Sequence, residues 1–226
     1  MTASTFSQLK TYMRSCMEDN AHDQEHVFRV LYTALDIAKT EESVDYDVLI
    51  CACLLHDIGR REQAKNASIC HAAFGAKQAH DYLISHGFDS EFAAHVRDCI
   101  AAHRFRKDTP PQTIEAKILF DADKLDAAGA IGIARTLLYQ GNLSDPLYSI
   151  LPNGQVSDGQ NDDTPSFFQE YHFKLKKLYD RFYTIRGKQL AMERQKTAVD
   201  FYQALFREAN SSYETGKSIL SMNIER

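Results

Sequence analysis

The sequence predicts an all-α fold, in which helices pack into a bundle that is extended by additional C-terminal helices. Three observations support this. Apolar residues recur at helical spacing along most of the chain, Val, Ile and Thr are not grouped into alternating strands, and no Asn-Gly or Asp-Gly hairpin signal separates two such runs. Apolar residues make up 44 % of the 226 residues, so the chain can build a packed core.

Five helices are expected in the first half of the chain. The second carries an apolar stripe that includes Val27 and Val30, and the third is apolar almost all round, from Val48 to Leu55. A helix of that kind belongs at the centre of a bundle. Gly59 and Gly87 end the third and fourth helices, because glycine is common just after a helix. The expected ranges are 6–17, 23–39, 45–58, 68–86 and 90–103.

A long sixth helix is expected over 113–140, after a break at Pro110-Pro111. Gly129 and Gly132 inside it indicate either close contact with a neighbouring element or a break.

Residues 142–165 lack periodicity and are rich in turn residues, which predicts a long loop. Such a loop is either a lid over a site or a passive excursion. C-terminal helices follow over 166–213, with a division near residue 186. We expect them to pack on the first bundle, so that residues 1–226 form a single domain.

The formal net charge is −5 at pH 7. Binding a nucleic-acid polymer needs a broad basic face, so we expect no such partner. A small phosphorylated molecule stays compatible with this charge, because a local cluster of Arg and Lys can bind it. No apolar run is long enough to cross a membrane, and residues 1–17 lack the apolar core of a secretory signal.

Five cysteines occur, and none belongs to a C-x-x-C pair. Reduced thiols in a cytoplasmic protein are therefore expected, and a cysteine metal site is not, because the zinc spacings are absent.

His56 and Asp57 follow the most apolar helix of the chain. Burying an isolated carboxylate is costly unless it is paired, hydrogen-bonded or bound to a metal ion. The last turn of so apolar a helix should reach the interior, and it delivers two good metal ligands side by side. The alternative is an exposed last turn with ordinary surface residues.

Three carboxylates lie close together further along the chain, at Asp121, Asp123 and Asp126. Asp123 shares a helix face with Leu119, so it lies in an apolar stripe and needs a partner, whereas Asp121 is rotated away from that face. The alternative is a solvated polar face that includes Asp126 and Lys124.

His26 borders the apolar face of the second predicted helix. A lone histidine there is more often a satisfied core residue than a metal ligand. His26 is therefore a candidate ligand only in combination with the other two clusters, at His56-Asp57 and at Asp121–Asp126. Taken in order, His26, His56-Asp57 and Asp123 resemble the HD-domain superfamily of metal-dependent phosphohydrolases, in its small bacterial single-domain subgroup. The resemblance covers about residues 23–135, and residues 184–194 fit less closely. Its specific segments are Leu54–Gly59, Asp121–Ala127 and Ala130–Arg135.

The resemblance implies an all-α metal-binding core over about residues 20–140. It also implies that His26, His56, Asp57 and Asp123 are the metal ligands. The apolar stripe independently favours Asp123 over Asp121. Imidazole favours Mn, Fe, Co, Ni or Zn over Mg, while carboxylates admit Mn and Mg, and no feature of the sequence selects among these divalent ions.

Two further histidines, His71 and His103, resemble positions that hold a second metal ion in two-metal relatives. In one-metal relatives the same region contacts substrate phosphate or a bridging water. The alternative for each is a structural or solvent-facing histidine.

The resemblance implies cleavage of a phosphate ester or anhydride by metal-activated water, in a small and nucleotide-like substrate. The catalytic candidates are Asp57, His103 and Asp126. Asp126 or Asp121 is alternatively a support for a ligand histidine. The candidates for substrate contact are Arg60, His71, His103 and Lys124.

Two rival functions remain open. A di-iron oxygenase would need both His71 and His103 as ligands. A non-catalytic sensor or interaction module would bind metal without turnover. A homodimer is compatible with the sequence.

Overall fold

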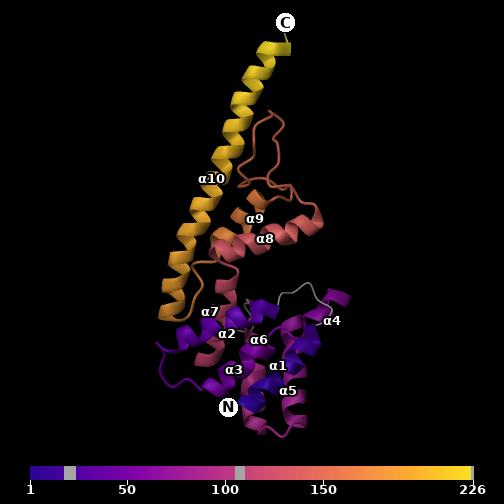
Figure 1. Ribbon diagram of the computed structural model, residues 1–226, viewed down its shortest axis with the longest axis vertical. Helices are drawn as coiled ribbons and strands as arrows, with labels where there is room; N and C mark the ends of the chain where they lie inside the picture. The colour runs from indigo at the N-terminus through magenta and orange to yellow at the C-terminus, as the bar shows by residue number, and fades with distance from the viewer. Residues whose placement is uncertain (18–23, 105–109, 225–226) are drawn as a thin grey trace. The chain divides into compact units, whose positions relative to one another are not determined.

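The computed structural model of the protein describes residues 1–17, 24–104 and 110–224 (Figure 1). Regular structure in these residues is helical, apart from an isolated bridge between Ile150 and Val156. The predicted all-α fold is therefore confirmed. None of the described helices combines the length and the apolar character needed to span a bilayer.

The chain divides into two compact units. The first unit comprises residues 1–126 and 182–188, and the second comprises residues 127–181 and those from 189 onward. The single domain that we expect over 1–226 stays a prediction. The helices of the first unit are α1 (Ala3–Met17), α2 (Gln24–Ala38), α3 (Tyr46–Leu55), α4 (Arg60–Lys65), α5 (His71–Ser85), α6 (Ser90–Ala102) and α7 (Ile114–Asp126).

Helix α3 lies at the centre of the first unit and packs against α1, α2, α6 and α7. The Asp45 side chain caps its start by accepting hydrogen bonds from the backbone N–H groups of Asp47 and Val48. The buried face of α3 extends almost all round the helix, as its uniformly apolar sequence predicts. The helix ends at Leu55, three residues earlier than expected, and a short helix α4 that the sequence analysis did not predict begins at Arg60.

Gly59 allows α5 to approach the turn between α3 and α4. A Cβ atom on Gly59 would lie 2.3 Å from the His71 carbonyl oxygen and 2.7 Å from the Gly75 nitrogen. Both of these are backbone atoms, so a side chain at position 59 would push the first turn of α5 away. This contact holds His71 beside the turn that carries His56 and Asp57.

The prediction of one continuous helix over residues 113–140 is wrong. The chain forms α7 and then α8 (Gly129–Leu143), with Gly129 at φ +64°. A Cβ atom on Gly132 would lie 2.1 Å from the Ala127 carbonyl oxygen, so a side chain at position 132 would overlap the backbone just before α8. Of the two alternatives that the sequence left open for these glycines, the break is therefore present. Asp121, Asp123 and Asp126 consequently occupy the final turns of a helix.

The second unit contains α8, α9 (Phe167–Phe173), a short 3₁₀ helix (Leu175–Lys177) and most of α10 (Ile185–Ile224). The helix expected over 166–185 is therefore much shorter than predicted, whereas the last helix extends beyond residue 213. The loop before α9 is tied to this unit, because Val156 is buried in its core and the Tyr202 hydroxyl donates to the Asp158 carbonyl at 2.6 Å. Whether the loop acts as a lid stays a prediction.

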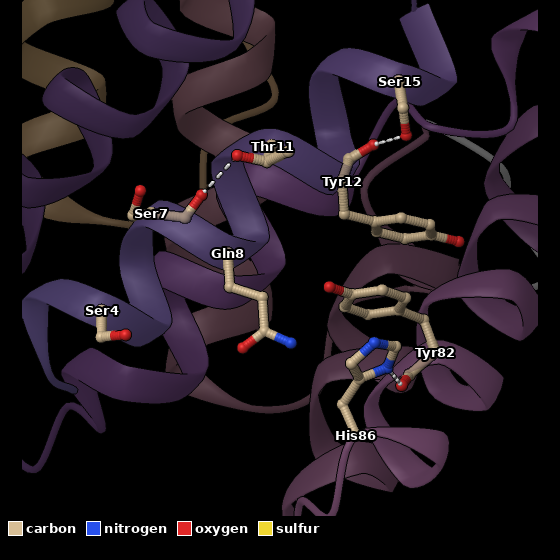
Figure 2. Close-up of a pocket in the computed structure, with 8 residues that line it drawn as sticks. All are labelled: Ser4, Ser7, Gln8, Thr11, Tyr12, Ser15, Tyr82 and His86. Carbon is tan, nitrogen blue, oxygen red and sulfur yellow. Dashed lines mark hydrogen bonds between the residues drawn. The ribbon is translucent and has the colours of Figure 1, made fainter.

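Stacked aromatic rings connect α1 with α5 at a shallow surface hollow. Figure 2 shows the Tyr12 ring lying face to face with Tyr82, and His86 on the other side of Tyr82. The Tyr12 and Tyr82 ring centroids lie 3.6 Å apart, and those of Tyr82 and His86 lie 4.0 Å apart. The remaining lining residues are the polar side chains Ser4, Ser7, Gln8, Thr11 and Ser15.

Candidate metal centre

Side chains from three parts of the first unit meet inside the apolar bundle. His26 comes from α2, His56 and Asp57 from the turn after α3, and Asp123 from α7. The His26 Nε2 atom lies 3.3 Å from Asp123 Oδ1, 3.3 Å from His56 Nε2 and 3.4 Å from Asp57 Oδ2. His26, His56 and Asp57 are buried, whereas the Asp123 side chain is 23 % exposed. The centre is therefore open to solvent at Asp123.

A second cluster adjoins the first through Asp57. Its Oδ1 atom lies 3.7 Å from Nε2 of His71 and 3.7 Å from Nε2 of His103, while its Oδ2 atom faces His26. We call His26, His56 and Asp123 the first triad, and Asp57, His71 and His103 the second triad. Within each triad the candidate ligand atoms all lie within 4.8 Å of one another. Asp57 thus stands between two groups of metal-ligating side chains.

The four imidazole rings are oriented in the same way. Each Nδ1 atom is held by an oxygen acceptor, which directs each Nε2 atom toward the centre, and in a neutral ring with its proton on Nδ1 the Nε2 atom carries a lone pair. The Nδ1 contacts are His26 to Asp126 Oδ2 at 2.7 Å, His56 to the Cys53 carbonyl at 2.7 Å, His71 to Gln63 Oε1 at 2.6 Å and His103 to the Ile100 carbonyl at 2.6 Å.

Several of these inward atoms are buried without a hydrogen-bond partner among the described residues. They are Asp57 Oδ2, His71 Nε2 and His103 Nε2. Unsatisfied buried polar atoms are costly, and three at one point require an explanation. The donor set of two triads of imidazole and carboxylate groups fits a divalent cation, which would satisfy these atoms.

The charges of the site favour a cation. Burial alone would lower the pKa of His26, but its contacts with Asp123, Asp126 and Asp57 raise it to about 11. Burial also works against the charged form of Asp57, yet its interactions with His56, His26 and Arg60 hold its pKa well below its usual range. The carboxylates are therefore ionised, and they select positive charge at this point.

Two of the other three rings, those of His56 and His71, are neutral near pH 7. Burial lowers the pKa of His56 to about 4. Burial, followed by the nearby Arg60 guanidinium, lowers the pKa of His71 to about 3. Neutral imidazole is the form that binds metal ions, so a cation at the first triad would take the place of the Nε2 proton that the raised pKa keeps on His26.

The remaining predicted residues occupy distinct positions. Arg60 donates from Nε to Asp57 Oδ1 at 2.9 Å. The Asp126 carboxylate lies behind His26, on its Nδ1 side. The Lys124 Nζ atom lies 4.1 Å from the ring centroid of Phe120 and 5.7 Å from that of Phe182.

Asp121 belongs to neither triad. Its carboxylate accepts hydrogen bonds from the backbone N–H groups of Tyr183 and Thr184 and from the Thr184 hydroxyl, at 2.7 to 3.1 Å. It therefore anchors the start of α10 within the first unit, as a structural residue.

Two supporting residues were missed from the sequence. Gln63 orients His71, and Arg29 contacts Asp126 through two hydrogen bonds. Arg29 follows His26 by three positions, so it shares a helix face with that histidine, and this spacing was the available signal.

Comparison with known proteins identifies the family. The family model for the HD domain matches residues 24–128, a range that contains both triads. The crystal structure of a predicted HD-superfamily hydrolase from an uncultured Thermotogales bacterium is 30 % identical, with 91 % of this chain and 92 % of that chain covered and a TM-score of 0.59. The chain belongs to the HD superfamily.

Other relatives of this HD-superfamily protein match it over similar lengths. An HD-superfamily hydrolase from Bacillus thuringiensis is 28 % identical over 91 % of this chain and 96 % of its own, with a TM-score of 0.70. YpgQ of Bacillus subtilis is 29 % identical over 204 residues, which is 88 % of this chain and 90 % of YpgQ. A crystal structure of YpgQ in complex with ADP covers 90 % of this chain and 97 % of its own, at 27 % identity and a TM-score of 0.69.

Proposed function

We propose that this HD-superfamily protein is a metal-dependent phosphohydrolase that acts on a small phosphorylated substrate of the nucleotide class. The observation that carries the proposal is the convergence of His26, His56, Asp57 and Asp123 from three separate elements, with their ligand atoms directed to one point. These four residues would hold a divalent ion, which when bound would lower the pKa of a water molecule and polarise a phosphoryl oxygen.

The protein's own groups complete the site. With an ion at the first triad alone, the His103 Nε2 lone pair would accept a hydrogen bond from the attacking water and align it, whereas with a second ion at the second triad the same lone pair would be a metal ligand. Arg60, beside Asp57, offers positive charge to the phosphoryl group as charge develops in the transition state. Asp126 fixes the ring of His26.

The orientation of His71 and His103 bears on a second ion. A neutral ring that donates from Nδ1 cannot also donate to a phosphate oxygen from Nε2. Such a ring serves as a metal ligand or accepts from water. The lone pairs of both rings point toward Asp57 Oδ1, which favours a second cation at the second triad as part of the proposal.

A nucleotide is favoured for two reasons. The related YpgQ was crystallised with ADP. In the present chain, Arg60 and Arg104 both lie near enough to His71 to lower its pKa, so positive charge gathers where a phosphate chain would enter.

A di-iron oxygenase remains the second candidate, because Asp57 stands between two triads in the manner that two adjacent ions require. Elemental analysis separates the two: two irons per chain and substrate-dependent O₂ consumption would favour the oxygenase.

The test is hydrolysis across a panel of nucleotides and sugar phosphates with Mn, Mg, Co and Ni, with elemental analysis of the purified protein. Asp57→Ala and Asp123→Ala should each lose bound metal and activity, while Asp121→Ala is the matched control and should keep its metal. Loss of metal in Asp121→Ala but not in Asp123→Ala would overturn the ligand assignment. Metal binding that raises the unfolding temperature, without cleavage of any phosphate compound, would favour a non-catalytic module.

A further inference from the structure

The Arg29 guanidinium forms hydrogen bonds with the Asp126 carboxylate, which also contacts the proposed ligand His26. Its Nε atom donates to Asp126 Oδ1 at 2.7 Å, and its Nη2 atom donates to Asp126 Oδ2 at 3.1 Å. This is the two-pronged geometry in which arginine binds a carboxylate most specifically. Asp126 is buried, whereas the Arg29 side chain is 32 % exposed, so the pair extends from the interior toward the surface.

Asp126 in turn determines how His26 faces the metal centre. Its Oδ2 atom accepts from His26 Nδ1 at 2.7 Å, which leaves Nε2 directed at Asp123 and Asp57. The two oxygens of this one carboxylate contact both Arg29 and His26, so tilting the carboxylate plane would weaken these hydrogen bonds. The arginine therefore limits rotation of Asp126, and Asp126 limits rotation of the imidazole ring.

The arrangement also spans two helices. Arg29 and His26 lie on α2, one turn apart, and Asp126 is the last residue of α7, the helix that carries the ligand Asp123. The pair consequently fixes the distance between two of the four ligands at the point where α7 ends.

We propose that Arg29 is a positioning residue for the metal centre, which acts through Asp126 to hold His26 in its metal-binding orientation. The inference rests on the proposed metal-dependent function. It predicts that Arg29 contributes to metal affinity although it is not itself a ligand. Loss of such an outer partner typically weakens metal binding by about 10- to 100-fold.

The test is the dissociation constant for Mn²⁺, measured by calorimetric titration of the full chain after chelation. Arg29→Gln should raise it by at least about tenfold, and Arg29→Lys, which keeps the charge but loses the two-pronged geometry, should fall between parent and Arg29→Gln. Arg186→Gln is the matched control, because Arg186 donates to Asp36 at 3.0 Å with a similar side-chain exposure of 31 % and contacts Asp36 instead of a histidine support.

A double-mutant cycle separates positioning from general stability. In an Asp126→Asn background, Arg29→Gln should change the Mn²⁺ dissociation constant by less than about twofold. The carboxylate that connects Arg29 to His26 is already absent in that background. The unfolding temperature in the presence of chelator reports stability independently of metal binding.

A parental dissociation constant in folded Arg29→Gln would overturn the role of Arg29 while leaving the metal centre intact. If Arg29→Gln does not fold, Arg29→Lys decides in the same way, and an unchanged constant overturns the proposal. A parent chain that shows no saturable Mn²⁺ binding would instead overturn the metal centre itself, and the role of Arg29 with it.

Discussion

At the scale of single residues, the site contains four imidazole rings. Each ring has its Nδ1 atom in contact with an oxygen acceptor and its Nε2 atom directed toward the centre. His56 and His103 use backbone carbonyls three residues earlier in the chain, so their orientation follows from local helix geometry. His26 and His71 use side chains instead. A ring held by a side chain can be tested without altering a ligand.

Gln63→Leu should reduce hydrolysis about tenfold while leaving the ion at the first triad in place. The substitution removes the oxygen that accepts from His71 Nδ1, so the His71 ring loses its fixed orientation. Steady-state kinetics and elemental analysis together check this, with the exposed Gln112→Leu as control. Parental activity would show that His71 needs no support, and loss of the first ion would show that the two triads are not separable.

The converging residues could be predicted at this scale, together with Asp126 as a candidate support, whereas the supports Arg29 and Gln63 could not. His56-Asp57 and Asp123 sit in apolar segments, where an unpaired polar residue needs a reason, and the pattern therefore points to them. Arg29 sits beside them in a typical helical sequence, and its partner Asp126 lies 97 positions away. Its spacing of three positions from His26 is a local signal, but many solvated arginines share such a spacing with another residue.

Among the elements, the turn from α3 to α4 does most to bring the two triads together. It carries His56 and Asp57, and its Gly59 touches the first turn of α5, where His71 begins the helix. The sequence predicts only that a helix ends at Gly59. The close approach of α5 is a tertiary contact, which local sequence does not reveal.

Gly59→Ala should destabilise the fold by about 1–3 kcal/mol and lower activity, because the new methyl group would overlap backbone atoms of His71 and Gly75. Gly141→Ala is the control: no atom lies within 4 Å of its added Cβ, and alanine is the better helix former. Thermal unfolding and activity assays measure both. Equal unfolding temperatures for Gly59→Ala and parent would mean that α5 does not approach this turn as described.

The helix boundaries show where periodicity is insufficient. Apolar spacing continues through residues 113–140, so it predicts one helix, yet Gly129 adopts a left-handed conformation and the helix breaks. Glycine in a helical pattern is compatible with either outcome, and packing of the surrounding chain decides between them.

At the scale of the whole molecule, helical periodicity predicted the class of fold, and the helices of the described residues confirm it. No disulfide joins the cysteines in the described part of the chain. The division into two compact units was not predicted. The sequence left open whether Gly129 marks a close contact or a break, and the break is what separates α7 from α8.

Stability of the whole chain should fall at alkaline pH. Burial raises the pKa of Tyr12 from 10.0 to about 12. Between these values the unfolded chain loses the phenolic proton while the folded chain keeps it, so the free energy of unfolding decreases as pH rises from about 10 to about 12.

Tyr12→Phe should therefore weaken this dependence, and the exposed Tyr32→Phe should leave it unchanged. Chemical unfolding at a series of pH values measures the slope. An identical slope in Tyr12→Phe and parent would contradict the assignment of this effect to the half-buried Tyr12 hydroxyl.

The most direct test of the metal centre is anomalous X-ray scattering from crystals grown with Mn²⁺. Our account predicts a strong anomalous peak enclosed by Nε2 of His26 and His56 and by carboxylate oxygens of Asp57 and Asp123. A map without a peak there, in which these four side chains point to different places, would contradict it.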